Sequence, residues 1–183
     1  MSKSGSNFAA FQRRLRRLIA GMTAITAWLL VTTDASHAGS WITDPHSLCQ
    51  VWDPNPQVDE SAAWSGSCAG GRAEGPGSVQ WLKGGRAIET DKGAWRNGRQ
   101  VGKGVQTWST GRYEGELANG EPNGHGVLSL GHLRYEGQFR DGKPNGMGTL
   151  TEGSQTIQGT WKDGCLQSSA RKAWIGVPLS ASR

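Results

Sequence analysis

Three neighbouring residues are of the types that build a hydrolase triad. Asp44, His46 and Ser47 could supply the carboxylate, the base and the nucleophile of such a site. A triad is defined by its geometry, and residues this close in sequence rarely adopt it. We therefore predict that these residues are not a catalytic site. No other part of the sequence holds a catalytic constellation, which predicts that the protein is not an enzyme.

Metal and cofactor sites are also absent from the sequence pattern. No Cys or acidic residue stands at metal-ligand spacing from His125 or His132, which favours surface histidines. The chain has many glycine pairs, but no Gly-Lys-Ser or Gly-Lys-Thr follows them and no strand-to-helix switch accompanies them. The sequence therefore predicts no metal and no cofactor.

The glycines instead follow a repeat. From a first position, glycine recurs at +2, +7, +11 and +13, and 18 of the 28 glycines fall at these offsets. The last four units begin 22 residues apart, while the first step is 27 residues because of an insertion at 84–90. The units begin at Trp64, Asp91, Tyr113, Tyr135 and Ile157, and the fifth is cut short after Gly164.

Each unit predicts a β-hairpin. Positions 0, +2 and +4 carry an apolar side chain, a glycine and another apolar side chain, whereas the positions between them are mostly polar, as expected of a strand with one buried face. Asn-Gly or Asp-Gly follows at +6 and +7 in four units and predicts a two-residue turn. Return strands are expected after the second glycine pair, at 105–108, 127–130 and 149–152. A glycine between two large side chains leaves a gap, which we expect a ring of the neighbouring hairpin to cover.

The aromatic side chains of the repeats allow two interpretations. The favoured one is that they pack the sheet, because aromatic rings mostly provide buried area. The alternative is that some of them form a ligand-binding surface. The candidates for that surface are Trp95, Trp108, Tyr113, Tyr135, Phe139 and Trp161.

The repeat resembles a known family. The segments Tyr113-Glu-Gly115 with Gly124-His-Gly126 and Tyr135-Glu-Gly137 with Gly146-Met-Gly148 are similar to MORN repeats, and the similarity covers about residues 64–166. Such a resemblance implies an all-β fold, an elongated single-layer antiparallel sheet of successive β-hairpins without an active site of its own. The segment from Cys49 to Cys68 resembles the lead-in of exported bacterial MORN proteins.

The spacing of the repeats limits which cysteines can form a disulfide. Two strands per repeat would place Cys68 and Cys165 about 40 Å apart, whereas a disulfide needs Cα atoms within about 7 Å. Cys49 lies 19 positions before Cys68, in a segment that could fold back over the first hairpin. We predict a disulfide between Cys49 and Cys68 that pins a cap onto the open sheet edge. Cys165 is then free or links two chains.

The N-terminal 38 residues are typical of an export signal. Basic residues up to Arg17 precede an apolar run and then Ser36-His37-Ala38, which predicts a signal helix cleaved near Ala38. The alternative is an inner-membrane anchor formed by Leu18 to Thr33. Most of the formal charge of +5 belongs to this leader, because 15 basic and 14 acidic residues remain after it. A nucleic-acid partner is therefore not expected.

The complete prediction divides the chain into a signal peptide at 1–38, a cap segment at 39–63, five repeats at 64–166 and a tail at 167–183. The tail could dock as a terminal cap or lie on a membrane surface. The expected function is a non-catalytic binding or scaffold protein, periplasmic or secreted, that offers its sheet to a protein partner. Binding of cell-wall glycan through exposed aromatics, or association with a membrane surface, are the alternatives.

Overall fold

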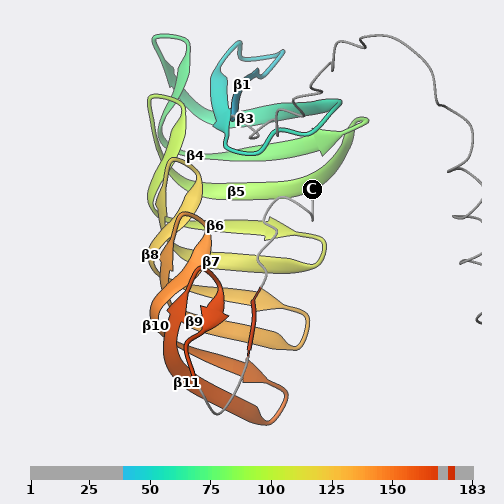
Figure 1. The fold of residues 1–183 in the computed structure, drawn as a ribbon. Coiled ribbons are helices and arrows are strands. Elements are labelled where there is room, and N and C mark those ends of the chain that lie inside the picture. The colour runs from blue at the N-terminus through green and yellow to red at the C-terminus, as the bar shows by residue number, and fades with distance from the viewer. Residues whose placement is uncertain (1–38, 169–172, 176–183) are drawn as a thin grey trace, which may run out of the picture. The chain divides into compact units, whose positions relative to one another are not determined.

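A computed structural model describes residues 39–168 and 173–175, and these residues form one twelve-stranded sheet without helices. Five consecutive hairpins make up most of it, and Figure 1 shows them side by side from β3 to β11. The predicted fold of successive antiparallel hairpins is confirmed. The hairpin strands are β3 (Glu60–Ala69), β4 (Arg72–Lys83), β5 (Arg86–Arg96), β6 (Arg99–Trp108), β7 (Gly111–Ala118), β8 (Glu121–Leu130), β9 (Leu133–Arg140), β10 (Lys143–Glu152), β11 (Gln155–Lys162) and β12 (Cys165–Leu166).

Two short strands precede the hairpins. β1 (Ser40–Thr43) and β2 (Gln50–Asp53) pair antiparallel with each other. β2 then meets β4 through a single parallel pair, Gln50 with Arg72. The predicted signal helix and membrane anchor lie outside the described residues. Within the described part of the chain, no helix is long and apolar enough to cross a membrane.

The Asn-Gly and Asp-Gly pairs form the turns that the sequence predicts. Asn97, Asn119, Asp141 and Asp163 have φ between 48° and 55°, and the glycines after them have φ between 75° and 85°. Positive φ at both central residues defines the type I′ turn, whose twist matches that of the flanking strands. These four pairs therefore set where the last four of the five hairpins reverse.

The return strands begin earlier than the sequence predicts. β8 and β10 start directly after their turns and already contain Pro122 and Pro144. The register of the pair shifts between Gly115 and Leu117 in one hairpin and between Pro144 and Gly148 in another. The glycine at +11 lies at this bulge, with φ of 110° at Gly124 and 114° at Gly146. The bulge allows a proline near the turn to remain part of a strand.

The turns also link each hairpin to the one before it. Gly120 donates its backbone N–H to Gln100 O, Gly142 to Pro122 O and Gly164 to Pro144 O, at 2.9–3.0 Å. Gly98 makes the same bond to Ala73 O in the preceding hairpin. The last hairpin receives an equivalent bond from Ile175, whose N–H donates to Gly164 O at 2.8 Å. The described part of the tail, 173–175, thus docks on the terminal hairpin.

Candidate functional site

The aromatic face of the sheet is a core and not a binding surface. Each of the six candidate rings is at most 6% exposed, so the prediction of an aromatic ligand surface is wrong and the packing interpretation describes these side chains. Tyr135 contacts Phe139 and Trp161 edge-to-face, with ring centroids 5.2 Å apart. The candidates are Trp95, Trp108, Tyr113, Tyr135, Phe139 and Trp161.

Glycine pairs make room for these rings. Gly115 lies opposite Gly126 across β7 and β8, and Tyr113 covers the pair with its own ring. A Cβ added at Gly126 would lie 2.6 Å from two carbons of that ring. The covering ring thus belongs to the same hairpin, and the prediction that a neighbouring hairpin supplies it is wrong. The reason is that Tyr113 lies two residues before Gly115 on the same face of β7, so its ring reaches along its own strand over the glycine pair.

The tyrosine hydroxyls are held inside this core. Tyr113 donates to Glu116 O at 2.8 Å and Tyr135 to Gln138 O at 3.2 Å. Burial raises the pKa of Tyr135 to about 12, and burial together with the charge of Glu116 raises that of Tyr113 further. Both hydroxyls therefore remain protonated donors with a structural role.

The second repeat, which has an acid at position 0, contains a buried polar network. Asp91 is 2% exposed and accepts a hydrogen bond of 2.7 Å from Trp81 Nε1. Gln106 donates to Gln100 Oε1 at 3.2 Å and to Gly120 O at 2.9 Å. Gln100 and Leu117 cover the glycine pair that a ring covers elsewhere. This network separates two hydrophobic clusters, and we assign it to the core because its hydrogen bonds run within the protein.

The triad residues of the sequence form a structural turn. Ser47 donates its hydroxyl to Asp44 and not to His46, and the His46 side chain is 92% exposed. Three backbone N–H groups, of His46, Ser47 and Trp64, also donate to the same carboxylate, at 3.0–3.3 Å. The Ser47 hydroxyl is thus bonded to the carboxylate and not to the imidazole, whose Nδ1 lies 3.5 Å from Asp44 Oδ1. Asp44 instead caps the N–H of Trp64 on edge strand β3.

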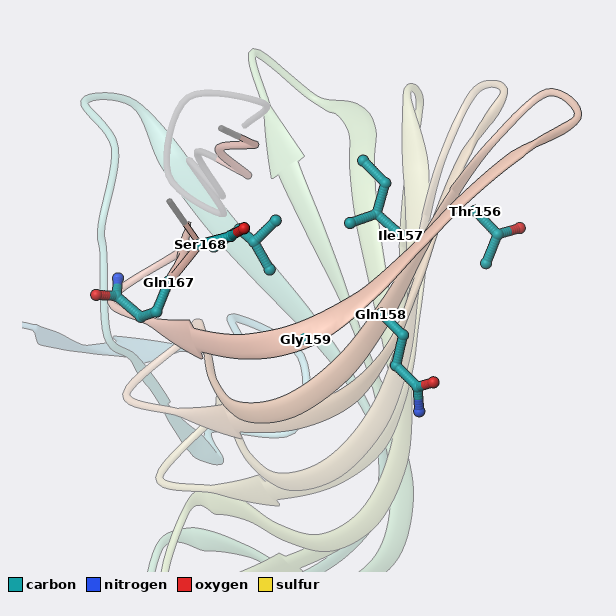
Figure 2. Close-up of a pocket in the computed structure, with 7 residues that line it drawn as sticks. Thr156, Ile157, Gln158, Gly159, Gln167 and Ser168 are labelled. Carbon is teal, nitrogen blue, oxygen red and sulfur yellow. The ribbon is translucent and has the colours of Figure 1, made fainter. Parts of the chain in front are cut away.

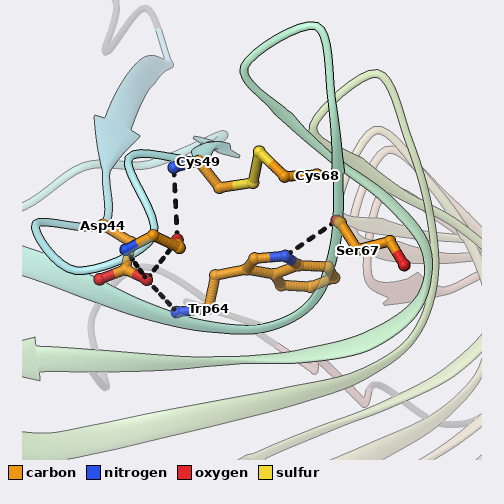
Figure 3. Close-up of a disulfide and its surroundings, with 6 residues drawn as sticks. Asp44, Cys49, Trp64, Ser67 and Cys68 are labelled. Carbon is orange, nitrogen blue, oxygen red and sulfur yellow. Dashed lines mark hydrogen bonds between the residues drawn. A yellow bond between two sulfur atoms is a disulfide. The ribbon is translucent and has the colours of Figure 1, made fainter.

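The predicted disulfide is present and lies beside this turn. Cys49 and Cys68 are bonded, with Cα atoms 5.9 Å apart, and Figure 3 shows the bond next to Asp44 and Trp64. Cys49 is fully buried, and Trp64 Nε1 donates to Ser67 O at 3.0 Å. The bond and the carboxylate together fasten the lead-in segment to β3. An Asp followed two residues later by a polar residue is typical of such turns, so the sequence held a signal for this role of Asp44.

The ionisation of Asp44 depends on this cap. Burial opposes the charge, but the Ser47 hydroxyl and the backbone N–H groups outweigh it and lower the pKa from 3.8 to about 2. The charged form therefore stabilises the fold above pH 4, and we expect this contribution, about 2 kcal/mol, to be lost as the pH falls from about 4 to 2. Urea unfolding at pH 7 and pH 2 should show a smaller loss of stability for Asp44→Asn than for the parent protein. Asp59→Asn, at an exposed position, is the matched control and should behave like the parent; an unchanged pH response of Asp44→Asn would contradict the assignment.

A tryptophan and arginine cluster lies where the lead-in meets the first two hairpins. Trp41 and Trp52 contact each other edge-to-face at 5.1 Å. The guanidinium of Arg72 lies 4.2 Å from the Trp41 ring centroid, and that of Arg99 lies 3.9 Å from the Trp52 centroid. No sequence signal pairs these residues, because they come from four different strands. The cluster attaches β1 and β2 to β4 and β6.

The histidines and the third cysteine are at the surface. His125 is exposed, and His132 Nε2 lies 3.0 Å from Glu152 in an exposed pair. No group of three metal-ligating side chains occurs among the described residues. Cys165 is a free, exposed cysteine within the described part of the chain.

The opposite face of the sheet is polar and exposed. One row of paired residues crosses it with Lys92, Val105, Glu114, Val127 and Glu136. Arg112 pairs with Glu114, and Arg134 with Glu136, each at 2.7 Å and about half exposed. We call this face, as defined by Lys92, Arg112, Glu114, Arg134 and Glu136, the outer face. It mixes both signs of charge and is the surface that the sequence interpretation, which concentrated on aromatic rings, did not identify.

Comparisons with known proteins agree with this geometry. No curated protein matches the chain. The MORN repeat family matches residues 92–111, 113–130 and 135–151, which are three consecutive hairpins from β5 to β10. Repeats of this family are generally binding or scaffold motifs without catalytic activity. Residues 92–151 therefore form three consecutive MORN repeats.

Proposed function

We propose that this protein is a non-catalytic scaffold, exported to the periplasm or beyond it, that binds a protein partner through the outer face of its sheet. The observation that carries the proposal is the division of the sheet into two faces. The aromatic face is filled by its own side chains, whereas the outer face is exposed and polar. Binding has to use the exposed face, since no ring of the core is accessible.

The charge pattern of the outer face favours protein over other partners. Lys92 and Lys103 lie at one end of it, and Glu114, Glu116 and Glu136 lie further along. A surface that binds anionic lipid or nucleic acid would carry mainly positive charge. A surface with charges of both signs instead fixes the orientation of a protein partner that carries complementary charges. The alternative of glycan binding through exposed aromatics is not supported by the rings of the repeats, which are buried, and rests on the exposed ring of Trp174 in the tail.

Export is supported by the pattern of residues 1–38 and by the disulfide, since such bonds persist mainly in oxidising compartments. Intact mass of the protein from the periplasmic fraction tests this part. We expect a chain that begins at Gly39. A chain that keeps residues 1–38 and is found in the membrane fraction would mean that the leader is an anchor.

Photo-crosslinking in cells tests the binding face. A photoreactive amino acid at Lys92, Glu114 or Glu136 should give one discrete adduct with the same protein, because the three positions share a face. The matched control is Ser154, in an exposed turn between β10 and β11, which should give none. Glu114→Lys combined with Glu136→Lys should weaken the adduct about tenfold, as expected for like charges in an interface. Adducts that are equally strong from Ser154, or that form with peptidoglycan and not with protein, would refute the proposal.

A further inference from the structure

The two-residue turns of the hairpins share one hydrogen-bonding position, the carbonyl of the second turn residue. In the first, second and fifth hairpins this carbonyl accepts a backbone N–H from a segment outside the hairpins, at 2.7–2.8 Å. In the third hairpin the side chain of Gln106 donates to it at 2.9 Å. The four bonds are Gln50 N to Gly71 O, Trp52 N to Gly98 O, Gln106 Nε2 to Gly120 O and Ile175 N to Gly164 O.

The fourth turn lacks such a donor among the described residues. Gly142 donates its own N–H to Pro122 O, but no hydrogen bond joins its carbonyl to the part of the chain that the structure describes. The side chain that serves the third turn is not repeated, because Leu128 stands one repeat after Gln106. Gly142 is nevertheless buried. Since buried backbone carbonyls are almost always paired, a donor to this carbonyl is expected.

The lead-in shows how one extended segment serves two neighbouring turns. Gln50 and Trp52 are two residues apart and donate to the first and second turns. The second turn is itself bonded to the first hairpin, through the carbonyl two residues beyond Gly71. The fifth turn is bonded to the fourth hairpin in the same way, through the carbonyl of Pro144, two residues beyond Gly142. A step of two residues should therefore also join the fourth and fifth turns.

The tail is already bound at the fifth turn. After β12 the chain first runs beside β11, where Figure 2 shows Gln167 and Ser168. It then returns along β12, since Leu166 donates its N–H to Ala173 O at 2.9 Å and Ile175 donates to the turn at 2.8 Å. The described tail therefore runs towards the turn and not away from it.

This direction identifies the residue that can reach the fourth turn. Every second residue of an extended strand directs its N–H to the same side. The two candidates next to Ile175 are therefore Ala173 and Val177. Ala173 lies beside Leu166 of β12. Val177 is then the residue available to Gly142.

The tail sequence fits a strand with one apolar face at this place. Ile175 is 3% exposed within the core, whereas its neighbour Trp174 is 71% exposed. Val177 and Leu179 continue the apolar positions of this alternation. Pro178 has no N–H, but it falls at a position whose N–H would face away from the turns.

We propose that residues 176–179 form a strap in which Val177 donates its N–H to the carbonyl of Gly142. The side chains of Val177 and Leu179 then lie on the same side as Ile175 and extend the core. An extended segment of a partner would meet the same carbonyl. The tail is favoured because it is already bound one turn away, which gives its next residues a high effective concentration at Gly142.

Nuclear magnetic resonance of the purified protein, in the form that the cell accumulates and labelled with heavy nitrogen and carbon isotopes, tests the strap. A scalar coupling across the hydrogen bond should connect the Val177 nitrogen with the Gly142 carbonyl carbon. The coupling between Ile175 and Gly164 is the internal reference. The Val177 amide should also exchange with solvent at least about tenfold more slowly than in an unfolded chain.

A proline substitution tests the same bond by removing its donor. Val177→Pro should raise the exchange rate of the Ile175 amide about tenfold, because the tail then frays from the turns. Ser180→Pro is the matched control, since the N–H of residue 180 would face away from the turns. It should leave the exchange of Ile175 as in the parent protein. Unchanged amide spectra of the hairpins would show that both variants are folded.

The inference is overturned if the Val177 amide exchanges as in an unfolded chain, or if Val177→Pro leaves the exchange of Ile175 unchanged. A coupling from Val177 to Gly142 in a mixture of nitrogen-labelled and carbon-labelled chains would come from a second copy and would also overturn it. The outcome is independent of the partner that binds the outer face, because the purified protein is measured without that partner.

Discussion

Replacing Gly126 with alanine should lower the free energy of unfolding by about 3 kcal/mol, because overpacking a well-filled core costs about 1–3 kcal/mol or somewhat more. The added Cβ would lie 2.6 Å from two ring carbons of Tyr113, and that ring is fully buried and cannot move aside. The backbone of Gly126 itself tolerates alanine, since its φ is not in the left-handed region. The expected loss is therefore steric, and urea unfolding at pH 7 would measure it.

A second substitution separates this explanation from a general loss of flexibility. Tyr113→Leu removes the ring, and the fifth repeat already combines a branched aliphatic residue, Ile157, with a glycine at +2. Gly126→Ala should lower the free energy of unfolding clearly less in a Tyr113→Leu background than in the parent protein. If the two substitutions were additive, the ring would not be what excludes a side chain at Gly126.

Removing the disulfide should have an effect of similar size. Closing a loop of this length stabilises a fold by about 3 kcal/mol, and the bond also holds the lead-in on β3. Cys68→Ser should therefore lower the free energy of unfolding by about that amount, measured by urea unfolding without reductant. Cys165→Ser is the matched control, because Cys165 is exposed and unpaired, and its stability should be that of the parent. Equal stabilities of the two variants would show that the cap does not depend on the bond.

The hairpins could be predicted from sequence because their turns are encoded locally. Asn119-Gly120 and Asp141-Gly142 determine the turn type by themselves, and the apolar residues at 0 and +4 assign the buried face. The disulfide between Cys49 and Cys68 followed from strand spacing, since Cys165 lies four repeats away. These inferences need only the distances within a hairpin and between hairpins.

The remaining features depend on packing that local patterns do not encode. The ring of Tyr113 covers the glycine pair of its own hairpin, and the choice between this ring and one from a neighbouring hairpin depends on three-dimensional packing. Asp91 occupies a position that elsewhere holds a ring, and it is stabilised by Trp81 from the preceding hairpin. Trp41 and Arg99 meet through contacts between strands distant in sequence. The outer face was not identified because polar side chains on an exposed strand carry no signal of a binding role.

The turn glycines that bond to the preceding hairpin give the array a direction of assembly. Gly120 and Gly142 each reach back to a hairpin that has been synthesised before them, and no hairpin needs a contact from a later one to complete its own turn. A chain that emerges with its N-terminus first can therefore add one hairpin at a time onto a finished template. The segment at 173–175, which reaches Gly164 last, completes this vectorial folding and leaves the array with a defined end.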